Sequence, residues 1–232
     1  MKLALSLSLL LATLAPAAAA DLSEASPDYG KPAVAPLQWS GPYVGIGGGY
    51  GWGSTSHSFS LPAPSGNSDP KGGLGGAYAG YNYQMGRVVA GLEADVEAAD
   101  LSGSFSNASG LTSTGSSRLN WDASVRARFG AAFGPSLPYL TGGVAFAGYK
   151  FTGGPLPSSG FACCGSYSST LTGWTIGAGW DYAFTRHFVG RIEYRYTDYG
   201  KAHGELLPAQ PGIFMTTSNT TSVVRVGMSY KY

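Results

Sequence analysis

Charged side chains that recur at every second position are the residues whose types and spacing could do chemistry. Carboxylate and guanidinium groups with this spacing share one face of an extended strand. In an enclosed space they would have to pair, because a buried charge without a partner carries a heavy desolvation cost. We expect a structural salt-bridge network, with a narrow ion path as the alternative. Its expected members are Arg87, Glu93, Asp95, Glu97, Arg118, Asp122, Arg126, Arg128, Asp181, Arg191, Glu193, Arg195 and Arg225.

Three histidines are the other candidates for reactive groups, and all of them fall in expected loops or turns. A hydrolytic site needs a base beside a nucleophile. His57 stands among serines and His203 lies near Asp198 and Glu205, so either could be drawn into such a site. Neighbours of this kind are common by chance in polar loops. We therefore expect no enzyme activity, no catalytic residue, no metal and no cofactor.

The only two cysteines are adjacent, at Cys163 and Cys164. They could form a vicinal disulfide, which is strained and easily reduced, or remain as thiols. Binding a metal together with His57 and His203 is the least favoured alternative. Two adjacent cysteines cannot supply the disulfide framework of a small secreted domain. Backbone pairing and packing must therefore hold the fold together.

Strands must position the charged side chains, because apolar and polar residues alternate with period two in eight segments. Short turns and long polar loops separate these segments in alternation, which is typical of an outer-membrane barrel with tight periplasmic turns. An even number of strands leaves both chain ends in the periplasm. The segments are approximately 39–52, 74–85, 87–98, 118–129, 139–149, 173–184, 188–197 and 223–232.

The last segment carries an apolar row that ends on an aromatic residue. Counting back by twos from Tyr232 gives Tyr230, Met228, Val226 and Val224. An apolar strand at the chain terminus is an exposed edge unless it pairs with another strand. Pairing with the first strand would close a barrel and remove that edge.

Alternation alone permits either a soluble binding barrel or a membrane barrel. Strands of about ten residues suit a tilted bilayer crossing, and glycine dominates the face opposite the apolar row in segments 39–52 and 173–184. Aromatic residues also recur near strand ends, where interfacial girdles lie. An eight-stranded barrel is just wide enough for side chains to fill it, which disfavours a broad pore. The expected girdle residues are Tyr43, Trp52, Trp121, Trp174, Tyr230 and Tyr232.

The amino end indicates export. Residues 1–20 have the charged start, apolar middle and small-residue cleavage site of a secretory signal. Residues 21–38 are rich in proline and alanine and predict a periplasmic linker, which leaves 39–232 for the barrel. Without Lys2 the 14 basic residues fall to 13 and equal the 13 acidic ones, so nucleic-acid binding has no electrostatic support.

Several motifs in order carry a family resemblance. They are WSGPYVG at 39–45, GYNYQ at 80–84, GLEAD at 91–95, PYLTGGVA at 138–145 and VRVG at 224–227. The chain resembles the small outer-membrane proteins of alphaproteobacteria, often called porin-family or outer-membrane immunogenic proteins. The resemblance implies a barrel in the outer membrane and brings no catalytic residues. It also implies that assembly machinery recognises the closing strand through Met228, Tyr230 and Tyr232.

Together these observations predict an all-β fold, an eight-stranded antiparallel up-and-down transmembrane β-barrel with short periplasmic turns and long external loops. The expected function is structural: the barrel supports envelope integrity and displays surface loops. A narrow channel for ions or very small solutes is the alternative. The expected partners are outer-membrane lipid and lipopolysaccharide, the barrel-assembly machinery, and host or surface ligands of the loops. We expect no nucleic-acid partner and a monomeric protein.

Overall fold

The fold is built from long antiparallel strands. The computed structural model describes residues 37–59, 66–106, 114–153, 166–205 and 214–232. None of these residues forms a helix long and apolar enough to cross a membrane, which has no bearing on crossing by strands. The strands are β1 (Gly41–Phe59), β2 (Gly66–Ser68), β3 (Lys71–Met85), β4 (Val88–Ser106), β5 (Thr114–Ala131), β6 (Ser136–Gly153), β7 (Ser166–Ala183), β8 (Phe188–Glu205) and β9 (Phe214–Lys231).

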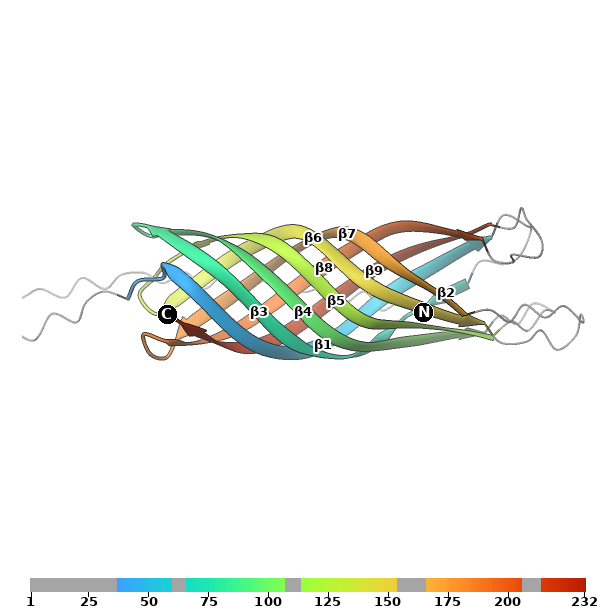
Figure 1. Ribbon diagram of the computed structural model, residues 1–232, viewed down its shortest axis with the longest axis horizontal. Coiled ribbons are helices and arrows are strands. Elements are labelled where there is room, and N and C mark those ends of the chain that lie inside the picture. The colour runs from blue at the N-terminus through green and yellow to red at the C-terminus, as the bar shows by residue number, and fades with distance from the viewer. Residues whose placement is uncertain (1–36, 60–65, 107–113, 154–165, 206–213) are drawn as a thin grey trace, which may run out of the picture. The chain divides into compact units, whose positions relative to one another are not determined.

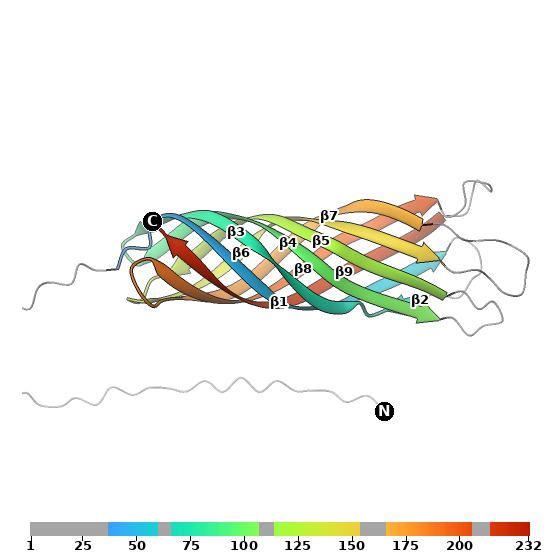
Figure 2. The ribbon, with the colours of Figure 1, turned by 60° about the horizontal axis from the view of Figure 1, so that its bottom comes forward.

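Eight of these strands close into one barrel (Figures 1 and 2). Each long strand pairs with the next in the chain, and β9 pairs with β1 from Tyr43 opposite Lys231 to Phe59 opposite Met215. The short β2 pairs with residues 55–57 of β1. It lies on the same side of β1 as β3, which pairs with β1 up to Trp52, and Pro70 lies between β2 and β3. The terminal strand therefore has no free edge, which confirms the predicted closure.

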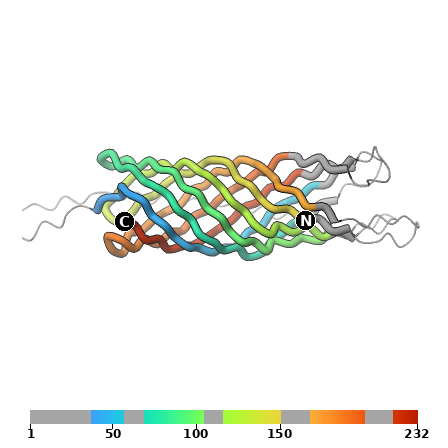
Figure 3. Tube along the Cα trace, in the orientation of Figure 1, coloured from blue at the N-terminus to red at the C-terminus, as the bar shows by residue number. Residues whose placement is uncertain are grey.

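The strands are strongly staggered around the barrel. A row of paired residues that leaves β1 at Val44 returns to β1 at Ser54, ten residues further along. A stagger of this size requires the strands to tilt against the barrel axis, and the tilt is visible in Figure 3. The row runs through Ala79, Ala94, Val125, Val144, Trp174, Asp198 and Thr220.

Tight turns lie at one end of the barrel. Gly86 and Gly134 adopt positive φ angles of 62° and 60° in two of these turns, a conformation that glycine adopts without steric cost. The carboxyl terminus lies at the same end (Figure 1). In an outer-membrane barrel the short turns face the periplasm, so the opposite end faces outward.

The strands extend several residues beyond the predicted segments at the outward end. For example, β4 reaches Ser106 and β6 reaches Gly153, whereas the sequence pattern predicted ends at 98 and 149. In these extensions the outer face carries hydroxyl side chains such as Ser54, Ser102 and Ser104. The alternation of apolar and polar residues therefore ends before the strands do, because the backbone pairing continues beyond it.

Apolar side chains cover the outside of the barrel rather than its inside. Ile46, Leu92 and Leu140 have exposed fractions of 71%, 64% and 64%. Exposed apolar surface of this extent marks contact with a partner or a membrane rather than with water. The inside carries the charged residues instead, which is the reverse of a soluble barrel.

Candidate functional site

The interior of the barrel is the part of the structure with distinctive chemistry. The structure places eleven of the thirteen expected network residues inside the barrel, each with an exposed fraction of 6% or less. Six are carboxylates and five are arginines. They are Glu93, Asp95 and Glu97 on β4, Asp122, Arg126 and Arg128 on β5, Asp181 on β7, Arg191, Glu193 and Arg195 on β8, and Arg225 on β9.

The centre of this interior network joins four strands, β4, β5, β8 and β9. Arg126 Nη1 and Arg225 Nη2 both donate hydrogen bonds to Glu193 Oε1, at 2.6 and 2.7 Å. Arg126 Nη2 also reaches Glu93 Oε1 at 2.6 Å, its direct neighbour across the β4–β5 pair. One carboxylate thus neutralises two arginines that come from opposite sides of the lumen.

Towards the periplasmic end, the arginines are held by rings as well as by carboxylates. Arg128 and Arg191 share Asp181, with N–O distances of 2.7 and 2.9 Å. The guanidinium of Arg128 lies 3.9 Å from the centre of the Tyr139 ring, a distance at which a cation is attracted to the ring face. Arg191 lies in the same way 4.3 Å from the centre of the Tyr78 ring.

Towards the outward end, Arg195 joins three carboxylates. Its Nη1 donates to Asp95 Oδ1 at 2.8 Å, and its Nη2 donates to Glu97 and Asp122 at 2.8 and 2.6 Å. Arg225 supplies a second donor to Asp95, also at 2.8 Å. Every interior carboxylate therefore faces at least one arginine.

Two expected members do not belong to the network, and for these the sequence prediction was wrong. Arg87 is exposed in the β3–β4 turn. Arg118 lies on the outside of β5, where its Nη2 pairs with Asp100 at 2.9 Å and its side chain is 57% exposed. A β-bulge between Leu119 and Trp121 is the reason, because one extra residue exchanges the two faces of a strand. Leu119 therefore points inward.

Hydroxyl groups that the sequence pattern did not assign to the network complete it. Tyr43 donates to Glu93 at 2.7 Å and Tyr139 donates to Glu193 at 2.6 Å. Tyr199 and Ser124 donate to Asp122 and Asp95. The prediction that Tyr43 belongs to an interfacial girdle was wrong, since it is 4% exposed and lies inside. Tyr43 is the direct neighbour of Val44 on β1. Because successive residues of a strand face opposite sides, the outward orientation expected for Val44 would have placed Tyr43 inside.

Apolar clusters close the interior on both sides of the charges. The periplasmic cluster comprises Trp39, Val89, Ala132, Leu137, Ala183 and Val189. The outward cluster comprises Leu101, Leu119, Ala145, Ala147, Tyr149, Leu171 and Tyr199. Between the network and the periplasmic cluster lies a cavity of about 10 Å³, which is room for about one water molecule.

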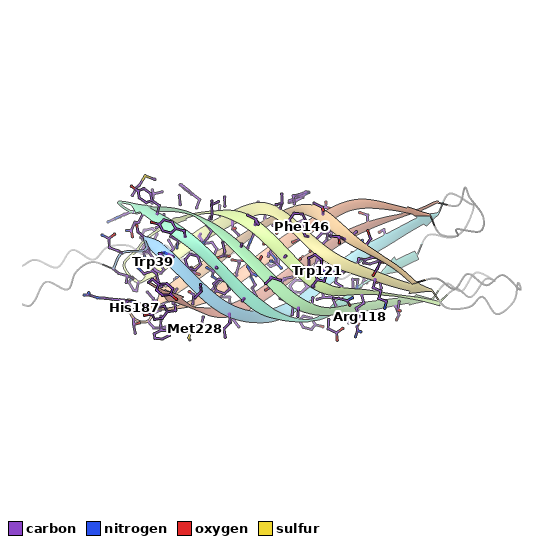
Figure 4. The ribbon with its side chains drawn as sticks, in the orientation of Figure 1. Trp39, Arg118, Trp121, Phe146, His187 and Met228 are labelled. Atoms are coloured by element: carbon purple, nitrogen blue, oxygen red, sulfur yellow. The ribbon has the colours of Figure 1, made fainter. Side chains whose placement is uncertain are left out.

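Trp39 is the main side chain of the periplasmic cluster. The predicted first strand began here, but β1 begins at Gly41, and the Trp39 ring turns into the barrel mouth with 2% of its surface exposed. Its backbone N–H donates to Gln84 and its indole N–H donates to Gly134 O, at 2.7 and 3.2 Å. Figure 4 shows it at the end that carries the tight turns. The Trp39 side chain therefore fills the periplasmic opening of the barrel.

Of the histidines and cysteines singled out in the sequence, only His187 has a side chain in the described part of the structure. His187 lies in the periplasmic β7–β8 turn, where its ring stacks on Tyr230 with 5.3 Å between centroids. The side chains of His57 and His203 and both Cys163 and Cys164 lie outside the part of the structure that is described. Within the described part, no group of three or more His, Cys, Asp or Glu side chains is arranged to hold a metal ion.

The expected assembly residues line the outside of the closing strand at its periplasmic end. Met228 and Tyr230 are 51% and 38% exposed, and Tyr232 is 67% exposed. Tyr230 contacts Phe188 and Tyr232 edge to face, with centroid distances of 5.5 and 5.1 Å. Their role in assembly stays a prediction.

Comparison with known proteins agrees with this geometry. Residues 6–231 match the family model described as the outer membrane protein beta-barrel domain. The chain is 35% identical to the 31 kDa outer-membrane immunogenic protein of Brucella melitensis, over 98% of this chain and 97% of the relative. It is 30% identical to the 22 kDa outer membrane protein of Rhizobium leguminosarum, over 84% and 78% of the two chains.

A solved structure shows the same fold. The outer membrane protein OprG of Pseudomonas aeruginosa superposes with a TM-score of 0.55 and 15% sequence identity, over 83% of this chain and 96% of that chain. The family model and the Brucella relative extend over nearly all of the present chain. The chain therefore belongs to the family of outer-membrane β-barrel proteins and is a protein of the outer membrane.

Proposed function

We propose that this protein is a closed structural barrel that supports the outer membrane and presents its outward loops as a surface, and that it is neither an enzyme nor a channel. Related Brucella proteins bear the name outer-membrane immunogenic protein, which supports a surface-exposed role here. We also propose that the barrel acts as a monomer assembled by the barrel-assembly machinery.

The filled interior carries this proposal. Five arginines and six carboxylates occupy the middle of the lumen, and an apolar cluster lies on either side of them. An ion entering this interior would have to displace paired charges and pass apolar side chains that offer it no ligands. The desolvation cost of such a path is high.

Conductance in planar bilayers tests the closed barrel. Purified full-length protein should insert without a steady open current, while an open porin added to the same bilayer shows that currents are detected. A steady ohmic current in most insertions would instead support the narrow channel. In that case, Glu193→Gln should change the ion selectivity, because Glu193 lies at the centre of the lumen.

The envelope role requires a separate experiment in cells. Deleting the gene should increase sensitivity to detergent and to chelators of divalent cations, and expression of the intact protein should restore resistance. Antibodies raised against the folded barrel should bind intact cells. A deletion strain with normal resistance would contradict the structural role, and absence of antibody binding would contradict surface display.

A further inference from the structure

The outer face of the barrel carries an unusual group of cations near its outward end. Among the strand residues whose side chains the structure describes, the charged ones on the outer face are Lys71, Asp100, Arg118, Lys150 and Asp198, and the exposed Asp69 lies just before β3. Of these strand residues, all except Asp198 lie together on β3 to β6. Further from the outward end, the described outer face is apolar or aromatic, so these charges lie near that end.

Strand pairing brings the three cations into one row. Lys71 lies opposite Ser102, Ser102 lies opposite Arg118, and Arg118 lies directly opposite Lys150. Directly opposite side chains have Cβ atoms about 5 Å apart, and neighbouring strands are about 4.8 Å apart. We call these three residues, Lys71, Arg118 and Lys150, the basic patch. Their long side chains can converge on one small anion.

Like charges directly opposite each other are destabilising in a sheet, and the Arg118–Lys150 pair is such a case. Asp100 relieves part of this repulsion, because it accepts hydrogen bonds from Arg118 at 2.9 Å. Among the described residues, Lys71 and Lys150 have no carboxylate within ion-pair distance. The exposed carboxylate of Asp69 lies only two residues before Lys71, but it forms no ion pair with it, so Lys71 and Lys150 are unpaired among the described residues.

The height of the basic patch matches the headgroup region of the external leaflet. Lys71 lies opposite Trp52, and Arg118 lies just outward of Trp121, as Figure 4 shows. Tryptophans of this kind mark the interface between hydrocarbon and headgroups. Beyond them, the outer face changes to Ser and Thr side chains.

We propose that the basic patch binds the phosphate groups of an anionic lipid headgroup in the external leaflet. Arginine and lysine are suited to phosphate, arginine through paired N–H donors and lysine as a compact charge. A phosphate placed between Lys150 and Arg118 would remove their repulsion, and Lys71 would hold a second phosphate or the far side of the same one. This site is separate from the barrel interior, so it does not depend on whether the barrel conducts.

Binding of lipid A to the full-length protein, refolded in a detergent without phosphate, tests the proposal. Each cation near a membrane surface contributes about 1 kcal/mol of attraction, which corresponds to about fivefold in affinity. The double variant Lys71→Ser/Lys150→Ser should therefore raise the apparent Kd of bisphosphorylated lipid A by roughly 5- to 30-fold. The effect should shrink as salt is added, because salt screens exposed charges.

A matched control removes the same net charge elsewhere. Arg87 and Arg186 are exposed in periplasmic turns, so Arg87→Ser/Arg186→Ser should leave the Kd unchanged. Asp100→Ser should tighten binding, because it removes the carboxylate that competes for Arg118. This opposite shift separates phosphate binding from a general loss of folding, which heat-modifiable gel mobility also monitors.

The outcomes that would overturn the proposal are specific. Equal binding by the wild type and the patch variant would do so, as would equal binding of lipid A and its dephosphorylated form. Inorganic phosphate is the second probe, and it should bind far more weakly than lipid A. Comparable affinity for inorganic phosphate would assign the patch to free phosphate and overturn the lipid assignment.

Discussion

Arg126 and Glu193 lie on β5 and β8 and meet across the lumen, with 2.6 Å between Arg126 Nη1 and Glu193 Oε1. The side chains of both are completely buried. This contact links walls of the barrel that share no backbone hydrogen bonds. The interior network therefore ties together strands that the sheet joins only through two intervening strands.

Removing one partner of that contact should destabilise the barrel strongly. Glu193→Ala would leave Arg126 and Arg225 without their shared carboxylate, and we expect a loss of about 3 to 5 kcal/mol in the free energy of unfolding. Asp100→Ala breaks an exposed ion pair and should cost less than about 1 kcal/mol. Urea unfolding in lipid vesicles, followed by tryptophan fluorescence, measures both. Equal losses would show that the interior pairs contribute no more than surface ones.

Close backbone approach should make an interior glycine intolerant of a side chain. A Cβ atom on Gly47 would lie 2.8 Å from Val226 O, so Gly47→Ala should cost about 1 to 3 kcal/mol through overpacking. On Gly73, which faces outward, the nearest atom would be 4.0 Å away. Gly73→Ala should be neutral or stabilise by up to about 1 kcal/mol, since glycine is unfavourable within a strand. The same unfolding assay applies, and destabilisation by Gly73→Ala alone would contradict the assigned faces.

The outer face of the barrel should tolerate a larger apolar side chain but not a charged one. Leu92→Arg and Val125→Arg should each cost about 2 to 4 kcal/mol if they lie near the bilayer midplane. Ala94→Trp should be tolerated, because Ala94 lines a shallow outer groove of about 740 Å³, and Ala127→Trp likewise faces outward. A packed core would be overfilled by either ring, at about 1 to 3 kcal/mol. Strong destabilisation by both Trp variants would count against lipid on this face.

The terminal residue should affect assembly more than stability. Without Tyr232, the chain should still refold in detergent but accumulate unassembled in the periplasm, if machinery recognises the closing strand. If Tyr232 only packs at the interface, its loss should lower stability in both settings by no more than roughly 1.5 to 3 kcal/mol. Fractionation of cells distinguishes the two cases. Normal outer-membrane levels of the truncated protein would exclude the recognition role.

The barrel itself could be read from the sequence because lipid and lumen demand opposite chemistry from alternate residues. Leu92 and Val96 alternating with Glu93, Asp95 and Glu97 specify both the strand and its faces. The same alternation correctly predicted eleven charged residues that face the interior. Where the exterior turns polar beyond the bilayer, this signal ended, and the outer parts of the strands were missed.

Only the tertiary structure decided how those charges pair and how the interior is closed. The bulge between Leu119 and Trp121 interrupts the pairing of β5 with β6, and it turns Arg118 outward to Asp100 and Leu119 inward. The ten-residue stagger brings Arg126 to Glu193 across the lumen, and the register of β5 against β6 places Lys150 opposite Arg118. Periodicity is a property of one strand, whereas register and stagger belong to the closed barrel, which is why the sequence alone could not determine them.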